Sequence, residues 1–141
     1  MSDKIVVLTE NAPAPAHVFS QGVQKGGIFQ ISGQGPMDPA SGEYIGRDDV
    51  RTQTKQTLEN IKAILEAGGS SVEDVLMFRV YLTSRDEFSA MNEAYGAFIQ
   101  ENVREGKLPC RTTVFVDLPH DIMLVEIDAL AVSSPSFNTA H

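Results

Sequence analysis

The 141-residue sequence predicts a single α/β domain in which two helices cover one face of a sheet of short strands. Three observations support this prediction. Two segments show the 3.6-residue apolar period of amphipathic helices, and short strand-like stretches occur before, between and after them. No internal repeat, long linker or charge block divides the chain. A domain of this length buries about two thirds of its unfolded surface, which is enough for a core without disulfides.

The N-terminal part is predicted to form three strands, over residues 4–8, 18–24 and 27–32. Pro13 and Pro15 exclude a helix between the first two strands, because the residue before a proline avoids the α conformation. Lys25-Gly26-Gly27 separates the second strand from the third, and such a glycine pair is typical of a β-hairpin turn.

Two helices are predicted from the apolar period. The first covers residues 48–67, where lysines and glutamates alternate on the face opposite the apolar positions, and Gly68 and Gly69 end it. The second begins with Ser84 as N-cap and Glu87 three residues later, which is the pattern of a capping box. It is expected to extend to about Glu101.

Three further strands are predicted over residues 76–83, 111–116 and 122–132. In the first two of these strands, the residues expected to face the helices are Leu76, Phe78, Val80, Leu82, Thr112, Val114 and Val116. In the last of them, the odd positions from Met123 to Ala131 are expected to lie beneath the helices. The even positions include Glu126 and Asp128 among apolar residues, and Arg111 is placed on the same outer face. Because two helices cover only one face of a sheet, the partly apolar second face needs a partner, and we predict self-association.

Composition excludes several classes of protein. The formal net charge is -8 and no stripe of lysine and arginine is present, which argues against nucleic-acid binding. The longest purely apolar runs have four residues, too few to cross a membrane, and the N-terminal residues lack a signal-peptide pattern, so a cytoplasmic location is expected. A single cysteine excludes an internal disulfide and cannot form a zinc site alone, and with only three separated histidines no metal site is expected. Residues 133–141 are expected to form a flexible tail.

The common catalytic motifs are absent, and the candidate chemistry is a charge pattern in apolar strands. Arg111 and Glu126 could form an ion pair between subunits of an oligomer. Alternatively, Arg111 could bind a small carboxylate through two hydrogen bonds while Glu126 orients water. The segment 32–36 is either an ordinary turn at a strand end or an anion site made of backbone amides. Asn92 lies in a helix, where asparagine is unfavourable, and its side chain either bonds a neighbouring loop or has no role.

Six segments together resemble the Rid family, also called the YjgF or L-PSP family. Each segment is weak alone, but they occur in the family's order over nearly the whole chain: Phe19-Ser20-Gln21-Gly22-Val23, Ile31-Ser32-Gly33-Gln34, residues 53–61, Met91-Asn92-Glu93-Ala94-Tyr95, residues 109–114, and Val125-Glu126-Ile127-Asp128-Ala129.

The resemblance implies a chorismate-mutase-like α/β fold and a homotrimer with sites in the clefts between subunits. RidA-type members hydrolyse reactive 2-enamino and 2-imino acids, such as 2-aminoacrylate and 2-aminocrotonate, to 2-keto acids and ammonia without a cofactor. By position, Arg111 matches the arginine that binds the substrate carboxylate, and Glu126 matches the glutamate associated with the attacking water. Phe19, Ser32, Gly33 and Asn92 match further pocket positions.

Two features depart from the RidA pattern. Phe19 replaces a pocket tyrosine and His17-Val18 replaces the usual Gly-Pro before it, so one hydroxyl and one stiff turn are missing. Cys110 replaces the alanine that commonly precedes the arginine. The resemblance also leaves two other functions open. One is a non-catalytic trimer that binds a small carboxylate as a metabolic sensor. The other is the endoribonuclease or translation-inhibitor activity historically attached to the family, which the net charge of -8 disfavours.

Overall fold

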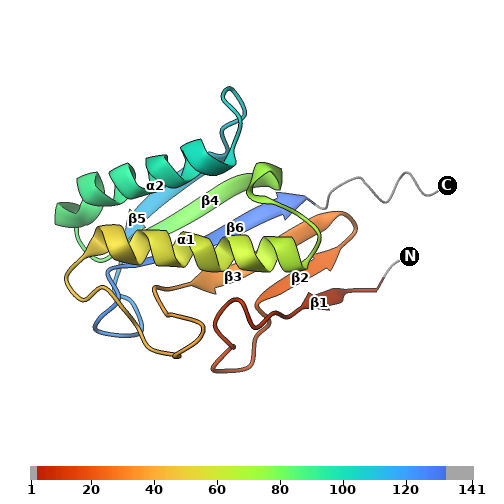
Figure 1. Ribbon diagram of the computed structural model, residues 1–141, viewed down its shortest axis with the longest axis horizontal. Coiled ribbons are helices and arrows are strands. Elements are labelled where there is room, and N and C mark those ends of the chain that lie inside the picture. The colour runs from red at the N-terminus through yellow and green to blue at the C-terminus, as the bar shows by residue number, and fades with distance from the viewer. Residues whose placement is uncertain (1–2, 133–141) are drawn as a thin grey trace.

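The structure, a computed structural model, describes residues 3–132 and shows two α-helices lying on one face of a six-stranded mixed sheet (Figure 1). The sheet order is β1-β2-β3-β6-β4-β5, with β4 and β5 parallel and the other neighbours antiparallel. The predicted α/β class and the placement of both helices are confirmed. The predicted tail at 133–141 lies outside the described residues. The elements are β1 (Ile5–Val7), β2 (Gly22–Lys25), β3 (Ile28–Gln34), α1 (Val50–Ala67), β4 (Val75–Leu82), α2 (Phe88–Asn102), β5 (Cys110–Phe115) and β6 (Val125–Val132), with short 3-10 turns at Val72–Asp74 and Arg85–Glu87.

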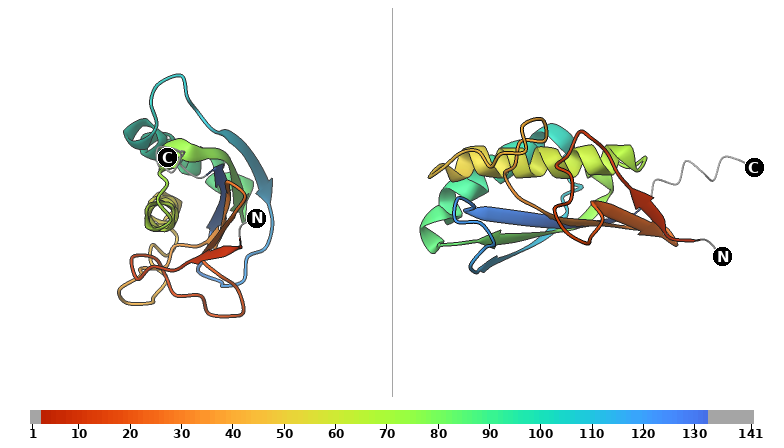
Figure 2. Two further views of the ribbon diagram at one scale, coloured as in Figure 1. Left: turned by 90° about the vertical axis from the view of Figure 1, so that its right-hand side faces the viewer. Right: turned by 90° about the horizontal axis from the view of Figure 1, so that it is seen from below.

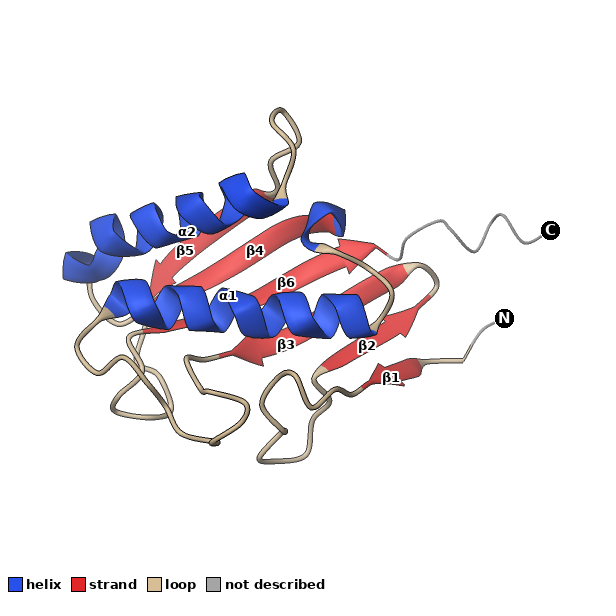
Figure 3. Cartoon of the chain, in the orientation of Figure 1, coloured by secondary structure: helices blue, strands red, loops and turns tan. Residues whose placement is uncertain are grey.

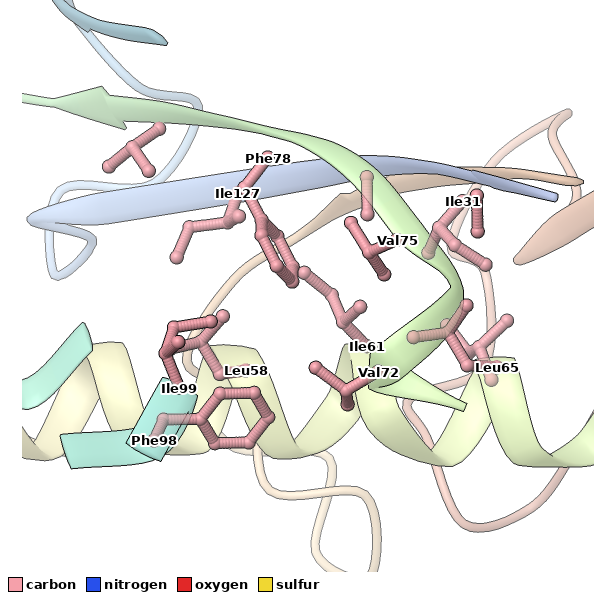
Figure 4. Packing of buried hydrophobic residues seen from close by; sticks show 14 of the residues in the cluster. Ile31, Leu58, Ile61, Leu65, Val72, Val75, Phe78, Phe98, Ile99 and Ile127 are labelled. Carbon is pink, nitrogen blue, oxygen red and sulfur yellow. The ribbon is translucent and has the colours of Figure 1, made fainter. Parts of the chain in front are cut away.

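The core lies between the helices and the inner face of the sheet. The Asp49 side chain caps α1 by accepting a hydrogen bond from the Thr52 backbone at 3.2 Å, and the helix ends at Gly68. The helix buries an aliphatic stripe that includes Leu58 and Ile61, which face the sheet residue Phe78 (Figure 4). Burial of such side chains provides the main stabilisation of the fold.

Several element boundaries differ from the predictions by a few residues, and side-chain hydrogen bonds account for three of these differences. The second strand begins at Gly22 rather than 18, because the Gln21 side chain bonds the backbone of the preceding loop. Ser84 caps a 3-10 turn, accepting from the Asp86 backbone at 3.0 Å, so α2 starts only at Phe88. The last strand begins at Val125 rather than 122, since Gln53 of α1 bonds the Ile122 carbonyl and the Leu124 amide instead.

The inner faces of β6 and β4 were largely predictable. The odd residues of β6 are buried, as predicted. In β4, a register shift between Val75 and Met77 turns Val75 inward and leaves Leu76 53% exposed, which corrects the predicted burial of Leu76.

The predicted faces of β5 were wrong. Arg111 pairs with Phe78, which faces the helices, so Arg111 lies on the helix side of the sheet. Val114 and Val116, which were predicted to face the helices, are instead partly exposed. The reason is that β5 is an edge strand under α2, where an arginine can lay its stem and guanidinium on aromatic rings while β-branched residues occupy the other face.

Neither of the two helices in the described part of the chain covers the opposite face of the sheet (Figure 2). Ile28, Val114 and Val132 remain well exposed on it or along its edges. Self-association through this face stays a prediction. Within residues 3–132, no helix has both the length and the apolar character that crossing a bilayer requires.

Candidate functional site

The first part of the candidate site is the Arg111 guanidinium, which lies over two aromatic rings of α2. Its central carbon is 4.8 Å from the centre of the Tyr95 ring and 5.9 Å from that of Phe88. Both distances are within the range of cation–π attraction. Burial raises the pKa of Tyr95 to about 12, so this ring stays neutral beneath the cation. Among the salt bridges of residues 3–132, none involves Arg111, so within the chain its charge is free to bind an anion.

Two polar groups near Arg111 have no partner. Phe88, Asn92 and Tyr95 follow the spacing i, i+4, i+7 and form one stripe of α2. The side-chain oxygen of Asn92 is buried and makes no hydrogen bond within the described residues, so it does not bond a neighbouring loop, which was one of the two alternatives for this residue. The Thr113 hydroxyl is likewise buried and unpaired. Leaving such groups unpaired is costly, and a bound molecule or a neighbouring subunit could satisfy them.

Thr113 was not among the predicted site residues. It lies two residues after Arg111, so both side chains emerge on the same face of β5. This alternation could have identified Thr113 once the face of Arg111 was known.

The second part of the candidate site surrounds Glu126 on the outer face of β6. Burial, and next the charge of Asp128, raise the pKa of the Glu126 carboxyl above its usual range. A side chain at Gly33 would collide with the Glu126 carboxylate, so only glycine permits this close approach. Gly33 lies within β3, where the pairing with β6 shifts register, rather than in a turn at the strand end. Ser32 donates a hydrogen bond to the Ser20 carbonyl at 2.6 Å.

Phe19 and Gly33 line a small cavity beside Glu126, and Tyr44 also lines it. The cavity volume is about 100 Å³. The loops that carry Phe19 and Tyr44 come together at one end of the sheet (Figure 3). Burial, and next the Glu126 charge, raise the pKa of Tyr44. Tyr44 was missed at the sequence level because no periodicity or motif marks a single tyrosine in a loop. It provides a phenol in the cavity whose other aromatic residue, Phe19, has none.

The two parts of the site do not meet within one chain. Glu126 lies on the outer face of β6 and Arg111 on the helix face of β5, with β4 between these strands. The prediction that both share one face was therefore wrong. The cation that compensates Asp128 is Arg79, at 2.7 Å, with Tyr81 donating a hydrogen bond at 2.9 Å. A site that uses Arg111 and Glu126 together needs more than one copy of the chain.

The described residues include no cluster suited to a metal ion. No group of three or more His, Cys, Asp or Glu side chains comes together within residues 3–132. Cys110 is exposed at the start of β5, and His120 stacks on Tyr44 with ring centres 4.4 Å apart.

Comparison with known proteins agrees with the sequence motifs. Residues 9–133 match the family model described as Endoribonuclease L-PSP. A RutC family protein of Pyrococcus horikoshii is 45% identical over 129 residues, covering 91% of this chain and 97% of that protein. The 2-iminobutanoate/2-iminopropanoate deaminase of Salmonella typhimurium is 40% identical over 127 residues, covering 89% and 95%.

Solved structures show the same fold. Escherichia coli TdcF, crystallised with bound serine, superposes with a TM-score of 0.84 at 35% identity, covering 92% of this chain and 99% of that one. The Escherichia coli YjgF gene product gives a TM-score of 0.84 at 36% identity with the same coverage. The family match and these relatives show that the chain belongs to the L-PSP family, also called the Rid or YjgF family.

Proposed function

We propose that the protein hydrolyses 2-imino and 2-enamino acids of the 2-aminoacrylate and 2-aminocrotonate type to 2-keto acids and ammonia. The observation that carries this proposal is the Arg111 guanidinium, held on two rings with no anionic partner within the described chain. A relative 40% identical to the chain is named as a deaminase of 2-iminobutanoate and 2-iminopropanoate, which are small carboxylates. An unpaired guanidinium is suited to binding such a carboxylate through two hydrogen bonds.

The proposed site lies between subunits of a homotrimer. Since Arg111 and Glu126 face opposite sides of the sheet, one copy would contribute Arg111 and Asn92 while a neighbouring copy contributes Glu126, Gly33 and the loop cavity. The uncovered outer face of the sheet offers an apolar surface for this assembly. Three equivalent clefts follow from the threefold symmetry.

The proposed mechanism uses only these side chains and water. Arg111 holds the substrate carboxylate and thereby fixes the position of the adjacent C=N carbon. Glu126 accepts a proton as water forms a C–O bond at this carbon, and the nitrogen gains a proton. The hydroxyl proton of the resulting carbinolamine is then transferred through Glu126 to the amino nitrogen as the C–N bond breaks, so that ammonia leaves and the keto acid remains. The sum is imino acid plus water giving keto acid plus ammonia, so no cofactor is needed.

A second candidate function is carboxylate binding without catalysis, because the free guanidinium serves it equally well. A bound carboxylate would then stabilise the protein against heat while no product forms. The nuclease activity in the family's description is not proposed, because a net charge of -8 disfavours binding to a phosphate backbone.

The test generates 2-aminoacrylate and 2-aminocrotonate in situ with a serine/threonine dehydratase and traps the imines with semicarbazide. We expect the protein to suppress formation of the semicarbazide adduct and to speed release of the keto acid. Light scattering on the same sample is expected to give three times the single-chain mass. If the protein does not change adduct formation, these two compounds are excluded as substrates. A single-chain mass at micromolar concentration would exclude the inter-subunit site.

Replacing Gly33 with alanine is expected to lower turnover by about 100-fold, because displacing a reacting group by about 1 Å has an effect of this size. The new methyl group would push the Glu126 carboxylate out of its position. That carboxylate is the end of a flexible side chain, so the melting temperature should change little. Binding of the product 2-oxobutanoate, which depends on Arg111, should persist by calorimetry. Turnover equal to that of the wild type would show that the position of Glu126 is unimportant.

A further inference from the structure

We propose that a groove beside Arg111 receives the apolar side chain of the substrate, so that the protein prefers 2-imino acids with long apolar side chains to those with short ones. This inference rests on the proposed function and concerns the same site. The proposed substrates have larger side chains than 2-aminoacrylate and 2-aminocrotonate.

The groove lies between α2 and the segment that leads into β5. Its volume is about 320 Å³, within the range of pockets that bind small molecules. Among the described residues, Arg111 is the only charged one that lines the groove, so a carboxylate bound to it would have the groove at its side. The residues lining the groove are Tyr95, Gly96, Ile99, Gln100, Leu108, Pro109 and Arg111.

The lining favours an apolar occupant. Leu108 is 71% exposed, and covering it with a hydrocarbon chain would remove apolar surface from water. The groove continues past Leu108 into a second hollow of about 440 Å³, where Glu105 contributes a negative charge. The Glu105 charge would repel a substrate whose own side chain is acidic and so weaken its binding. Arg111 therefore selects the carboxylate at one end, and the remaining surface selects neutral apolar groups.

Gly96 offers a way to fill the groove selectively. A Cβ added at Gly96 has no atom within 4 Å, so a side chain can leave the backbone there without a clash at its first carbon. Because Gly96 lines the groove, a phenylalanine there would occupy the space of a substrate side chain. The adjacent Ala97 lines a different hollow, between α1 and α2, and Ala97→Phe provides a matched control.

The experiment compares imino acids made by a D-amino-acid oxidase from D-leucine and D-alanine, with catalase present and semicarbazide as the trap. One methylene in an apolar pocket changes kcat/KM by about 10-fold or more, so we expect wild type to favour the leucine-derived imine by at least about 10-fold. Gly96→Phe should lose this preference, because kcat/KM for the leucine-derived imine should fall more than kcat/KM for the alanine-derived imine. Ala97→Phe should behave as wild type.

Two results would overturn the inference: a wild type that does not prefer the leucine-derived imine, or a Gly96→Phe variant that keeps the preference. Binding of 4-methyl-2-oxopentanoate and pyruvate, measured by calorimetry, tests the groove without turnover. If wild type hydrolyses neither imine, the proposed function fails. Tighter binding of the longer keto acid, abolished by Gly96→Phe, would still support the groove, and equal binding of the two would reject it.

Discussion

Replacing Arg111 with alanine is expected to reduce kcat/KM for imine hydrolysis by at least about 100-fold. The guanidinium is proposed to make two charged hydrogen bonds to the substrate carboxylate, and each bond to a charged group contributes about 1.5–3 kcal/mol. No salt bridge within the described chain depends on Arg111, and its ring contacts with Tyr95 and Phe88 are those of a partly exposed side chain. The variant should therefore keep its fold and trimeric mass while losing turnover in the semicarbazide assay.

Arg111→Lys is the matched control for this prediction. Lysine keeps the positive charge but cannot present two parallel donors to a planar carboxylate. We expect activity between that of wild type and Arg111→Ala, with most of the loss in KM if Arg111 acts mainly by binding. An Arg111→Ala protein that hydrolyses imines at the wild-type rate would contradict the assigned role. Loss of the trimer in this variant would point instead to the ion-pair interpretation of Arg111.

Much of the fold could be predicted because the relevant signals are local. The apolar period of α1 and the glycines after it determine where that helix lies and ends. The alternation along β6 was predictable because β6 is an inner strand that pairs with β3 on one edge and β4 on the other. The predictions were wrong where a distant residue decides the local structure. Gln53 of α1 delays the start of β6, and the bulge beside Val75 reverses the faces of two residues.

The candidate site was less predictable than the fold, because alternation within an edge strand does not show which face lies toward a helix. Arg111 could be placed only after its pairing with Phe78 was known. Its polar character suggested the outer face, whereas the rings of α2 make the inner face favourable. Tyr44 reaches the Glu126 cavity through loop geometry alone. Correct placement of Arg111 also changes the functional argument, because opposite faces require two copies of the chain to complete one site.

Replacing Glu126 with glutamine is expected to lower turnover by at least about 100-fold, in line with the loss of a general acid–base group. The pH profile tests this role separately. Burial and the Asp128 charge raise the pKa of Glu126 above its usual 4.5, and the ionised form is the one that accepts a proton from water. Wild-type kcat/KM should therefore fall on acidification with a midpoint above pH 4.5. The residual activity of Glu126→Gln should lack this acid limb.

Asp128→Asn provides a control for this fall in activity at acid pH, because removing the neighbouring charge should move the midpoint to lower pH while the plateau activity persists.

The pH dependence of thermal stability should be opposite to that of activity. A carboxyl whose pKa is raised by folding binds its proton more tightly in the native state, so wild-type stability falls as pH rises from 4.5 through the raised pKa. Glu126→Gln should thus melt at a higher temperature than wild type at pH 7, and the difference should vanish below pH 4.5. If Glu126→Gln is instead less stable than wild type at pH 7, the Glu126 carboxylate has a compensating cation in the assembled protein. A double-mutant cycle would then test Arg111 of a neighbouring subunit first.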